Sequence, residues 1–506
     1  MTALWMVLFW SLWVRGQNEA AVENYLEAMR RYRAGDKKGA LESFNLAIEA
    51  DPSNHEMLYN RGNLRVELGD KAGALDDYNR AIAAKPDFAF AYNNRANLKL
   101  QQGLEEEALA DYNKAIELKN DFADAYFGRG KIKKNRQLYG EAMADFNKAL
   151  ELNPKLLPAY TARGLLKMER DDLVGAEKDF TAVIDRKTDA AEAYFNRGNV
   201  RHKLGNKTGA MNDYDRALLL KNMNYPEAFY NRAVLKTEQG DKDGAMNDLN
   251  SSIAQNPDYA PAYFARGRLF YDKGDLEAAL KDYNRALEIS PDSAEAHNRR
   301  GMILKDKGDR AGALKDFEKA VELKPNFAEA HFNFGLLKFE MGDKKAAIEH
   351  FNDAIDLRPD YALAYANRAV VKISIGDKTG AEADYNKALE LNPTADTYYN
   401  RGVLKLDLQN YPAAIEDFSR AVELNPKHAE AYCSRGIARQ HLHQFNEALF
   451  DYNRAIELKN DLADAYYHRG LLKNDRGDRD GGCADLKTAA KLGEPQAQEA
   501  VAGLCR

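Results

Sequence analysis

A 34-residue period runs through almost the whole chain and restricts the folds it can adopt. The period is plainest in a series of small residues, in which one step is 35 residues and one is 33. The series comprises Ala40, Ala74, Ala108, Ala142, Ala176, Ala210, Ala245, Ala279, Ala313, Ala347, Ala381, Ala414, Ala448 and Gly482. Fourteen copies therefore span residues 21–496. A period of this length predicts a solenoid, because one unit cannot bury its apolar face alone and must stack on its neighbours.

Each copy reads as two short helices. In the copy 191–224, small and apolar residues recur at helical spacing, first around Gly198 and again around Ala210. Between the two sets lies a Gly-Asn pair, and most other copies have Gly-Asp there, which is a helix stop followed by a turn. We therefore predict two antiparallel helices per copy.

Small residues recur where two helices would have to cross closely. The eighth position of each copy is Gly or Ala, as in Gly62 and Ala96, and the twentieth is Ala in all copies but the last. An aromatic residue such as Phe44 or Tyr78 occupies the twenty-fourth position and would fill the space beside the crossing. A larger side chain at the eighth position would force the helices apart.

This pattern of small, alanine, aromatic and proline positions resembles the tetratricopeptide repeat family. The resemblance implies an all-α fold: an α-solenoid superhelix of about fourteen 34-residue helix-turn-helix repeats. Two departures recur. The Trp position of the family is usually Tyr here, as in Tyr92, and the Leu before the small residue is replaced by Arg, as in Arg95.

That arginine has a candidate partner in its own copy. Arg at the seventh position and Asp at the twenty-third occur together in twelve copies, and the first and tenth copies lack both. We expect structural ion pairs between helices, within one copy or between adjacent copies, and the alternative is two separately solvated charges. The pairs singled out are Arg197 with Asp213, Arg232 with Asp248 and Arg266 with Asp282.

The two ends differ from the repeats. Residues 1–16 are an apolar segment too short for a bilayer span, which fits a cleaved signal peptide, with a retained anchor or an artefact of the assigned start as alternatives. We therefore expect an exported protein, periplasmic, secreted or envelope-associated, or else one anchored by this segment. Residues 497–506 read as a capping tail, and Cys483 and Cys505 could pair there or remain free thiols.

Composition and motifs exclude several functions. The net charge of −6 gives no electrostatic drive toward nucleic acid. No phosphate-binding loop, HExxH or GxSxG motif occurs, and the densest histidine group, His428, Cys433, His441 and His443, has poor ligand geometry. We therefore expect no enzyme activity, no cofactor and no metal site.

The resemblance implies that the first helix of each pair lines a concave groove for a protein or extended peptide. Asn amides can pair with a peptide backbone without reading its sequence, and aromatic rings add apolar contact. Carried over position by position, the fifth and sixth residues of the copies give Tyr59, Asn60, Asn94, Phe127, Phe195, Asn196, Tyr230, Asn231, Phe264, Phe332, Asn333, Asn367, Tyr399, Asn400 and Tyr467.

Two interpretations of these residues stay open. In the first, they bind a partner, and the mostly acidic second position, as in Glu56 and Asp124, would favour a basic or neutral partner over an acidic one. In the second, the rings pack against the next copy and the amides bridge local groups, so the chain is a spacer or a self-assembling rod. Membrane contact would come only through an uncleaved N-terminal segment.

Overall fold

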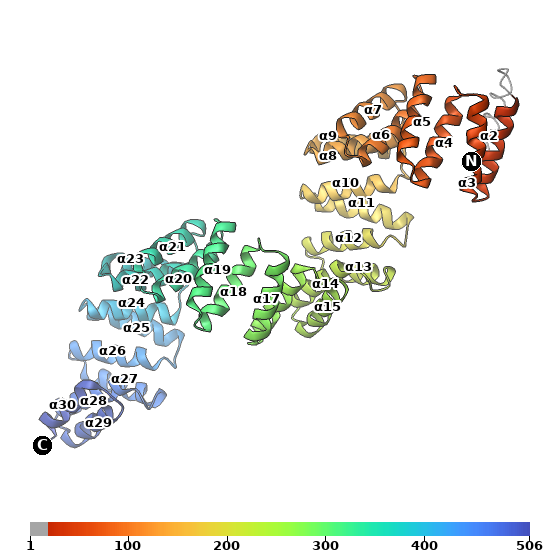
Figure 1. The fold of residues 1–506 in the computed structure, drawn as a ribbon. Helices are drawn as coiled ribbons and strands as arrows, with labels where there is room; N and C mark the ends of the chain where they lie inside the picture. Colours follow the sequence, from red (N-terminus) through yellow and green to blue (C-terminus); the bar gives the residue numbers. More distant parts are fainter. Residues whose placement is uncertain (1–18, 506) are drawn as a thin grey trace. The chain divides into compact units, whose positions relative to one another are not determined.

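The computed structural model describes residues 19–505, and every regular element in this range is an α-helix (Figure 1). The apolar segment 1–16 lies outside the described residues. The helices fall into two compact units, the first ending at Pro257 and the second beginning at Asp258. The all-α solenoid fold predicted from the period is confirmed.

The first unit contains seven helical hairpins. Its helices are α2 (Glu19–Arg33), α3 (Lys37–Ala50), α4 (His55–Leu68), α5 (Lys71–Ala84), α6 (Ala89–Gln101), α7 (Glu105–Leu118), α8 (Ala123–Asn135), α9 (Tyr139–Leu152), α10 (Leu157–Glu169), α11 (Leu173–Arg186), α12 (Ala191–Lys203), α13 (Lys207–Leu220), α14 (Pro226–Glu238) and α15 (Lys242–Gln255).

The second unit contains seven more hairpins and a terminal helix. Its helices are α16 (Ala260–Asp272), α17 (Leu276–Ile289), α18 (Ala294–Asp306), α19 (Arg310–Leu323), α20 (Ala328–Glu340), α21 (Lys344–Leu357), α22 (Ala362–Ser374), α23 (Lys378–Leu391), α24 (Ala395–Asp407), α25 (Tyr411–Leu424), α26 (Ala429–His441), α27 (Phe445–Leu458), α28 (Ala463–Asp475), α29 (Arg479–Lys491) and α30 (Pro495–Leu504).

The turn inside most hairpins follows from a Gly-Asp pair. Gly69 ends α4 with a φ of 85°, a left-handed conformation that favours glycine. The carboxylate of Asp70 then accepts a hydrogen bond from the backbone N–H of Gly73 at 2.9 Å and caps α5. Copies without this glycine place another residue in the left-handed region, such as Gln137 with a φ of 61° and Gln409 with a φ of 58°.

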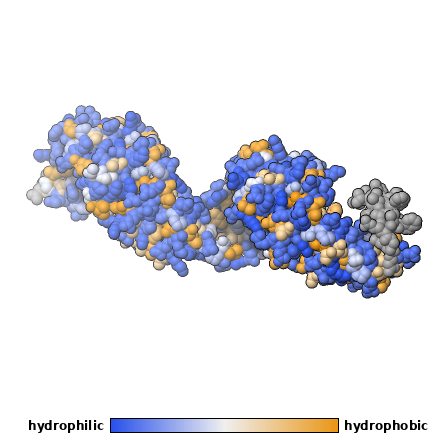
Figure 2. Space-filling model, turned by 90° about the horizontal axis from the view of Figure 1, so that it is seen from above, coloured by the Kyte–Doolittle hydropathy of each residue, from blue (hydrophilic) through white to orange (hydrophobic). Residues whose placement is uncertain are grey.

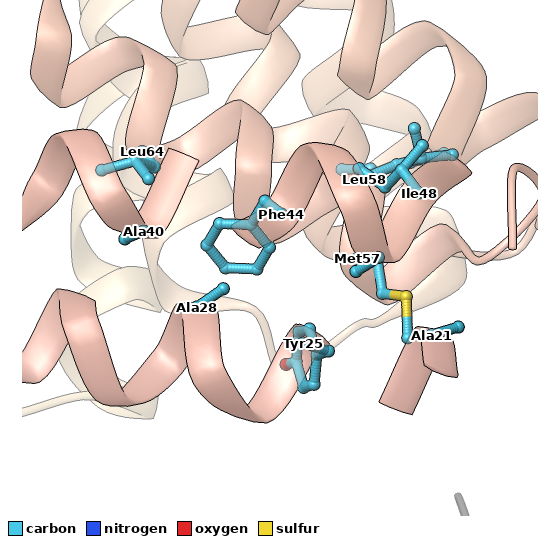
Figure 3. Packing of buried hydrophobic residues seen from close by; sticks show 12 residues of the cluster. Ala21, Tyr25, Ala28, Ala40, Phe44, Ile48, Met57, Leu58 and Leu64 are labelled. Carbon is cyan, nitrogen blue, oxygen red and sulfur yellow. The ribbon is translucent and has the colours of Figure 1, made fainter. Parts of the chain in front are cut away.

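Small residues and rings interlock where the paired helices cross. A Cβ atom on Gly62 would lie 2.7 Å from Cε1 of Tyr78, so the glycine leaves room for the ring of the twenty-fourth position. The Phe44 ring on α3 lies beside Ala28 of α2, and both side chains are buried (Figure 3). The close crossing predicted from the sequence is therefore present.

Each hairpin also packs on the next one within a unit. The first helices of neighbouring copies contact each other directly, for example α6 with α8 and α10 with α12. We call this side, formed by the even-numbered helices of a unit, the inner wall. On the face drawn in Figure 2, hydrophobic residues lie in separate patches among hydrophilic ones.

Among the described helices, none combines the length and apolar character that crossing a bilayer requires. At the C-terminal end, α30 contacts α29, and a disulfide joins Cys483 to Cys505 across 22 residues. Of the two states left open by the sequence, the structure therefore contains the bonded one.

Candidate functional site

The arginine of the seventh position forms a two-point ion pair with the aspartate of its own copy. In the sixth copy, Arg197 Nη2 lies 2.7 Å from Asp213 Oδ1 and Nε lies 3.0 Å from Oδ2. The same two-point contact joins Arg232 to Asp248 and Arg266 to Asp282 at 2.6–2.8 Å. All three aspartates are buried, so their charge is balanced inside the hairpin and is not solvated separately.

The seventh-position arginines also donate to polar side chains of the preceding copy, contacts that the sequence analysis missed. Arg163 Nη1 donates to Asn147 Oδ1 of the preceding copy at 2.8 Å. The aspartate meets a second cation as well, since Lys167 Nζ lies 2.9 Å from Asp179 Oδ2. Lys or Arg at the eleventh position was the sequence signal for this second contact.

The fifth-position rings lie between the copies. All eight are half-buried: Tyr59, Phe127, Phe195, Tyr230, Phe264, Phe332, Tyr399 and Tyr467. The Phe332 ring centroid lies 5.8 Å from that of Phe351 in its own copy and 5.0 Å from that of Tyr361, which precedes the next copy. Burial raises the pKa of the Tyr59 and Tyr399 hydroxyl groups, so both stay neutral and act as hydrogen-bonding groups.

Several sixth-position asparagines bridge to the preceding copy. Asn60 Nδ2 donates to the Tyr25 hydroxyl at 2.9 Å, and Asn94 Nδ2 donates to the Tyr59 hydroxyl at 3.1 Å. Two further bridges end on amide oxygens, from Asn231 to Asn199 at 2.8 Å and from Asn333 to Asn298 at 3.0 Å.

The other three sixth-position asparagines make no such bridge among the described residues. Asn367 Nδ2 donates to the carbonyl of Leu363 on its own helix. Asn196 and Asn400 make no side-chain hydrogen bond within residues 19–505, and both are half-buried. The predicted row of peptide-binding asparagines is thus partly a link between copies and partly without a hydrogen-bond partner among the described residues.

Ninth-position asparagines form a second row that the sequence analysis did not single out. Asn63 Oδ1 accepts hydrogen bonds from the Tyr78 hydroxyl and from Asn94 Nδ2, both at 2.8 Å. Asn97 Oδ1 accepts from the Tyr112 hydroxyl at 2.6 Å. Asn97 Nδ2 donates no hydrogen bond within residues 19–505, so Asn97 retains two unused N–H donors. Asn63 also forms a hydrogen bond with the Tyr59 hydroxyl, which opposes the rise in the pKa of that group.

These asparagines line a hollow of about 510 Å³ on the inner wall of the first unit. Three successive first helices, α4, α6 and α8, contribute to it. Asn63, Asn94 and Asn97 supply amides, Val66 and Leu100 supply apolar surface, and the remaining lining residues are Glu67, Tyr78, Leu98, Gln101 and Lys131. The hollow therefore offers polar and apolar contacts side by side.

Several second-position carboxylates already form ion pairs within the chain and are therefore less available to a partner. Lys324 Nζ lies 2.6 Å from Glu295 and holds the pKa of that carboxyl below its ordinary value. Arg358 lies 3.2 Å from Glu329, and Lys221 lies 3.7 Å from Glu192. Asp124 and Glu227 make no ion pair among the described residues.

One group of side chains in the described part of the chain could hold a metal ion: His331, His350 and Asp353. The sequence analysis missed this group because its histidines lie on separate helices. The sequence signal for this group was the joint loss of the seventh-position Arg and the twenty-third-position Asp in the tenth copy.

The stretch with the densest histidines in the sequence forms ring contacts, unlike the convergent group of His331, His350 and Asp353. His441 stacks on Tyr411 with centroids 4.5 Å apart, and His428 packs on Tyr399 with centroids 4.7 Å apart. Cys433 is buried, and burial raises the pKa of its thiol.

Family models match most of the repeats. Models described as "TPR repeat" match residues 105–137, 267–308, 301–342 and 441–474. Models described as "Tetratricopeptide repeat" match residues 25–88, 123–156, 161–229, 227–259, 332–396 and 395–428. A comparison with curated proteins gave no match.

Solved structures with a similar fold include c5321, a protective antigen present in uropathogenic Escherichia coli strains that displays an SLR fold. It is 18% identical, the match covers 86% of this chain and 97% of that one, and the TM-score is 0.59. YrrB, a TPR protein with an unusual peptide-binding site, is 25% identical over 36% of this chain and 96% of its own, with a TM-score of 0.33. The APC/C assembly Cut9–Hcn1 is 15% identical over 96% of each chain, with a TM-score of 0.42.

Proposed function

Because the chain belongs to the tetratricopeptide repeat family, we propose that it is a protein-interaction scaffold whose inner wall binds an extended segment of a partner protein. Its action would be binding alone, with many weak contacts in series and affinity gained from contiguous engagement.

The hollow of the first unit carries this proposal. Asn63 and Asn97 hold their amide oxygens on buried tyrosine hydroxyls, which fixes each side chain, and Asn97 keeps both of its N–H groups for another acceptor. An extended peptide presents backbone carbonyls that can accept from such amides whatever its side chains are. Val66 and Leu100 add apolar surface beside them.

The charge of the inner wall suggests the partner's chemistry. Asp124 and Glu227 carry carboxylates with no ion pair among the described residues, whereas Glu67 in the hollow is already paired with Lys37 at 3.0 Å. These charges favour a basic or neutral segment over an acidic one. No nucleic acid is expected as partner, since the chain has a net charge of −6.

We further propose that the chain is exported. The apolar segment 1–16 supports this, and so does the disulfide between Cys483 and Cys505, because such bonds persist in oxidising compartments. Anchoring by the same segment is the alternative. Protease accessibility of the native protein in intact and opened cells distinguishes an exported from a cytosolic location.

The groove proposal is tested with peptides selected from a random phage-displayed library on the purified chain. Their affinities are then measured by fluorescence anisotropy for the native chain and for Asn63→Ala/Asn97→Ala. Losing two amide bonds should weaken binding about tenfold. The matched control is Asn120→Ala/Asn135→Ala, which changes two exposed asparagines.

Equal affinity of the inner-wall variant and the native chain would reject the groove. Asn97 is chosen over Asn231 and Asn333 because it bonds only to Tyr112 of its own copy, whereas the latter two bond to the preceding copy. Asn63 also accepts a hydrogen bond from Asn94 of the next copy, so Asn97→Ala alone separates a lost peptide contact from a loosened stack. A spacer or self-assembling rod is the second candidate, favoured by the rings and amides that link the copies. It predicts no enriched peptide, and self-assembly predicts a sedimentation coefficient that rises with concentration.

A further inference from the structure

The tenth copy lacks the arginine–aspartate pair and replaces it with two rings. Phe334 and His350 occupy the two positions, and their rings stack with centroids 4.1 Å apart and an interplanar angle of 24°. Phe334 is buried. The hairpin α20–α21 therefore has no ionic link at the site where twelve other copies have one.

His331 on α20 faces this altered site. Its Nε2 lies 3.0 Å from the carbonyl oxygen of Pro325. A carbonyl can only accept, so Nε2 donates and the neutral ring keeps its lone pair on Nδ1. His297 occupies the same position in the ninth copy, but its Nδ1 lies 2.8 Å from Asp316 Oδ1. In the tenth copy His350 stands in place of that aspartate, so His331 lacks the equivalent partner.

Two ring nitrogens and a carboxylate oxygen converge there. Nδ1 of His331 and Nδ1 of His350 are buried and make no hydrogen bond within the described residues. Asp353 Oδ2 lies 3.2 Å from the first and 3.8 Å from the second, and all three atoms lie within 4.8 Å of one another. Most copies have Lys or Arg where Asp353 stands, for example Lys319 and Lys387.

We propose that His331, His350 and Asp353 bind a divalent transition-metal ion of the Zn²⁺ class, which joins α20 to α21 where other copies have an ion pair. Two imidazoles and a carboxylate form a ligand set that such ions accept. Donor atoms of a tetrahedral site lie about 3.4 Å apart for bonds of about 2.1 Å, close to the separations from Asp353 to the two rings.

The surroundings fit such a site. The contact of His331 Nε2 with a backbone carbonyl is the kind of outer contact that orients a metal-bound imidazole. The Asp353 side chain is 52% exposed, which leaves the solvent side open for entry and for a water ligand. The ion would also bind two buried ring nitrogens that otherwise make no hydrogen bond within the described residues.

The test uses the full chain with its disulfide oxidised, treated with EDTA and dialysed free of it, and titrated with ZnCl2 by calorimetry. We expect about one ion per chain, with at least tenfold weaker affinity in His331→Tyr and in Phe334→Arg/His350→Asp. Removing only an outer partner of a metal ligand already weakens metal binding about tenfold or more, so losing a ligand should cost at least that much. Both variants install residues that other copies carry, as in Tyr365 and the pair Arg368–Asp384, so both should fold.

The matched control is His297→Tyr, which removes the equivalent histidine of the ninth copy and should bind zinc like the native chain. Hydrogen exchange gives a second measurement. Zinc should slow amide exchange in α20 and α21 of the native chain and of His297→Tyr, but not of Phe334→Arg/His350→Asp. Zinc affinity that is unchanged in both tenth-copy variants, or no zinc binding by the native chain, would overturn the proposal.

Discussion

Arg435 holds both carboxylate oxygens of Asp451, with Nε 3.0 Å from Oδ2 and Nη2 2.7 Å from Oδ1. Asp451 has no exposed surface, and Arg435 is also buried. Arg439 Nη1 approaches the same carboxylate at 2.7 Å, and the third nitrogen of Arg435 donates to Ser419 of the preceding copy. One buried carboxylate thus organises two helices of its hairpin and, through Arg435, the stacking of two copies.

Removing one partner of this pair should be costly, because the other charge stays buried. We expect Asp451→Leu and Arg435→Leu each to destabilise α27 by about 3–5 kcal/mol, and the double variant by clearly less than their sum. The opening free energy of α27 from amide hydrogen exchange measures this locally, which suits a repeat chain that need not unfold in one step. Additive effects would mean that the two charges do not interact.

An exposed pair on the same helix is the control for that cycle. Arg454 Nη1 lies 3.0 Å from Glu457, but both side chains are largely solvated. Arg454→Leu and Glu457→Leu should couple by no more than about 0.5 kcal/mol, since solvent screens such pairs. A coupling as large as that of the buried pair would show that burial is not the cause.

The second prediction concerns the close crossing of the paired helices, which a larger side chain should disturb. A Cβ atom on Gly130 would lie 2.7 Å from Cε1 of Phe146, whereas a Cβ on Gly140 of the same hairpin meets nothing within 4 Å. Gly130→Val should therefore destabilise α8 and α9 by about 1–3 kcal/mol through overpacking. Hydrogen exchange in both helices measures it. Gly140→Val is the control and should change exchange little; equal effects would contradict the packing argument.

The period and its small residues were enough to predict the fold and the crossing geometry. A small residue and an aromatic residue stand at the positions of Gly130 and Phe146 in most other copies. Their contact could therefore be inferred from any of these copies. The turn was also readable, because Gly69 and Asp70 have conformational and capping roles that follow from their chemistry.

The role of the asparagines was harder to predict, because a neighbouring copy can take the place of a ligand. Asn94 reaches the Tyr59 hydroxyl 35 residues earlier, one period plus one residue. A polar row repeated at the period has the same sequence pattern whether it binds a partner or the next copy. Asn63 and Asn97 could be distinguished only once the tyrosine hydroxyls that hold them were located.

His468 should make the last hairpin sensitive to acid. Burial holds the pKa of its imidazole below the ordinary value; Asp464 on the same helix opposes this shift, and His441 on α26 adds to it. The ring also stacks on Tyr452 of α27. Because the unfolded chain then binds the proton more readily, stability should fall as the pH drops below about 6.5.

His468→Asn isolates this effect, because Asn stands at the equivalent position in several copies, such as Asn400. The opening free energy of α28 is measured by hydrogen exchange from pH 7.5 to 5.5. The native chain should lose more stability than the variant over this range, because the two proteins differ only at residue 468. Parallel curves would show that the His468 ring is not protonated on unfolding.

The disulfide should hold the terminal helix in place. Cys505 follows α30 and is bonded to Cys483 on α29, while Ala497 is the one residue of α30 that is fully buried. With so little apolar burial, the closed loop of 22 residues should supply most of the stability of α30, about 3 kcal/mol. Reduction with dithiothreitol should therefore speed amide exchange in α30 about 100-fold, with α26 and α27 unchanged. Cys505→Ser should show the fast exchange without reductant and no further change with it. Slow exchange in this variant would mean that α30 is held by its packing on α29 alone.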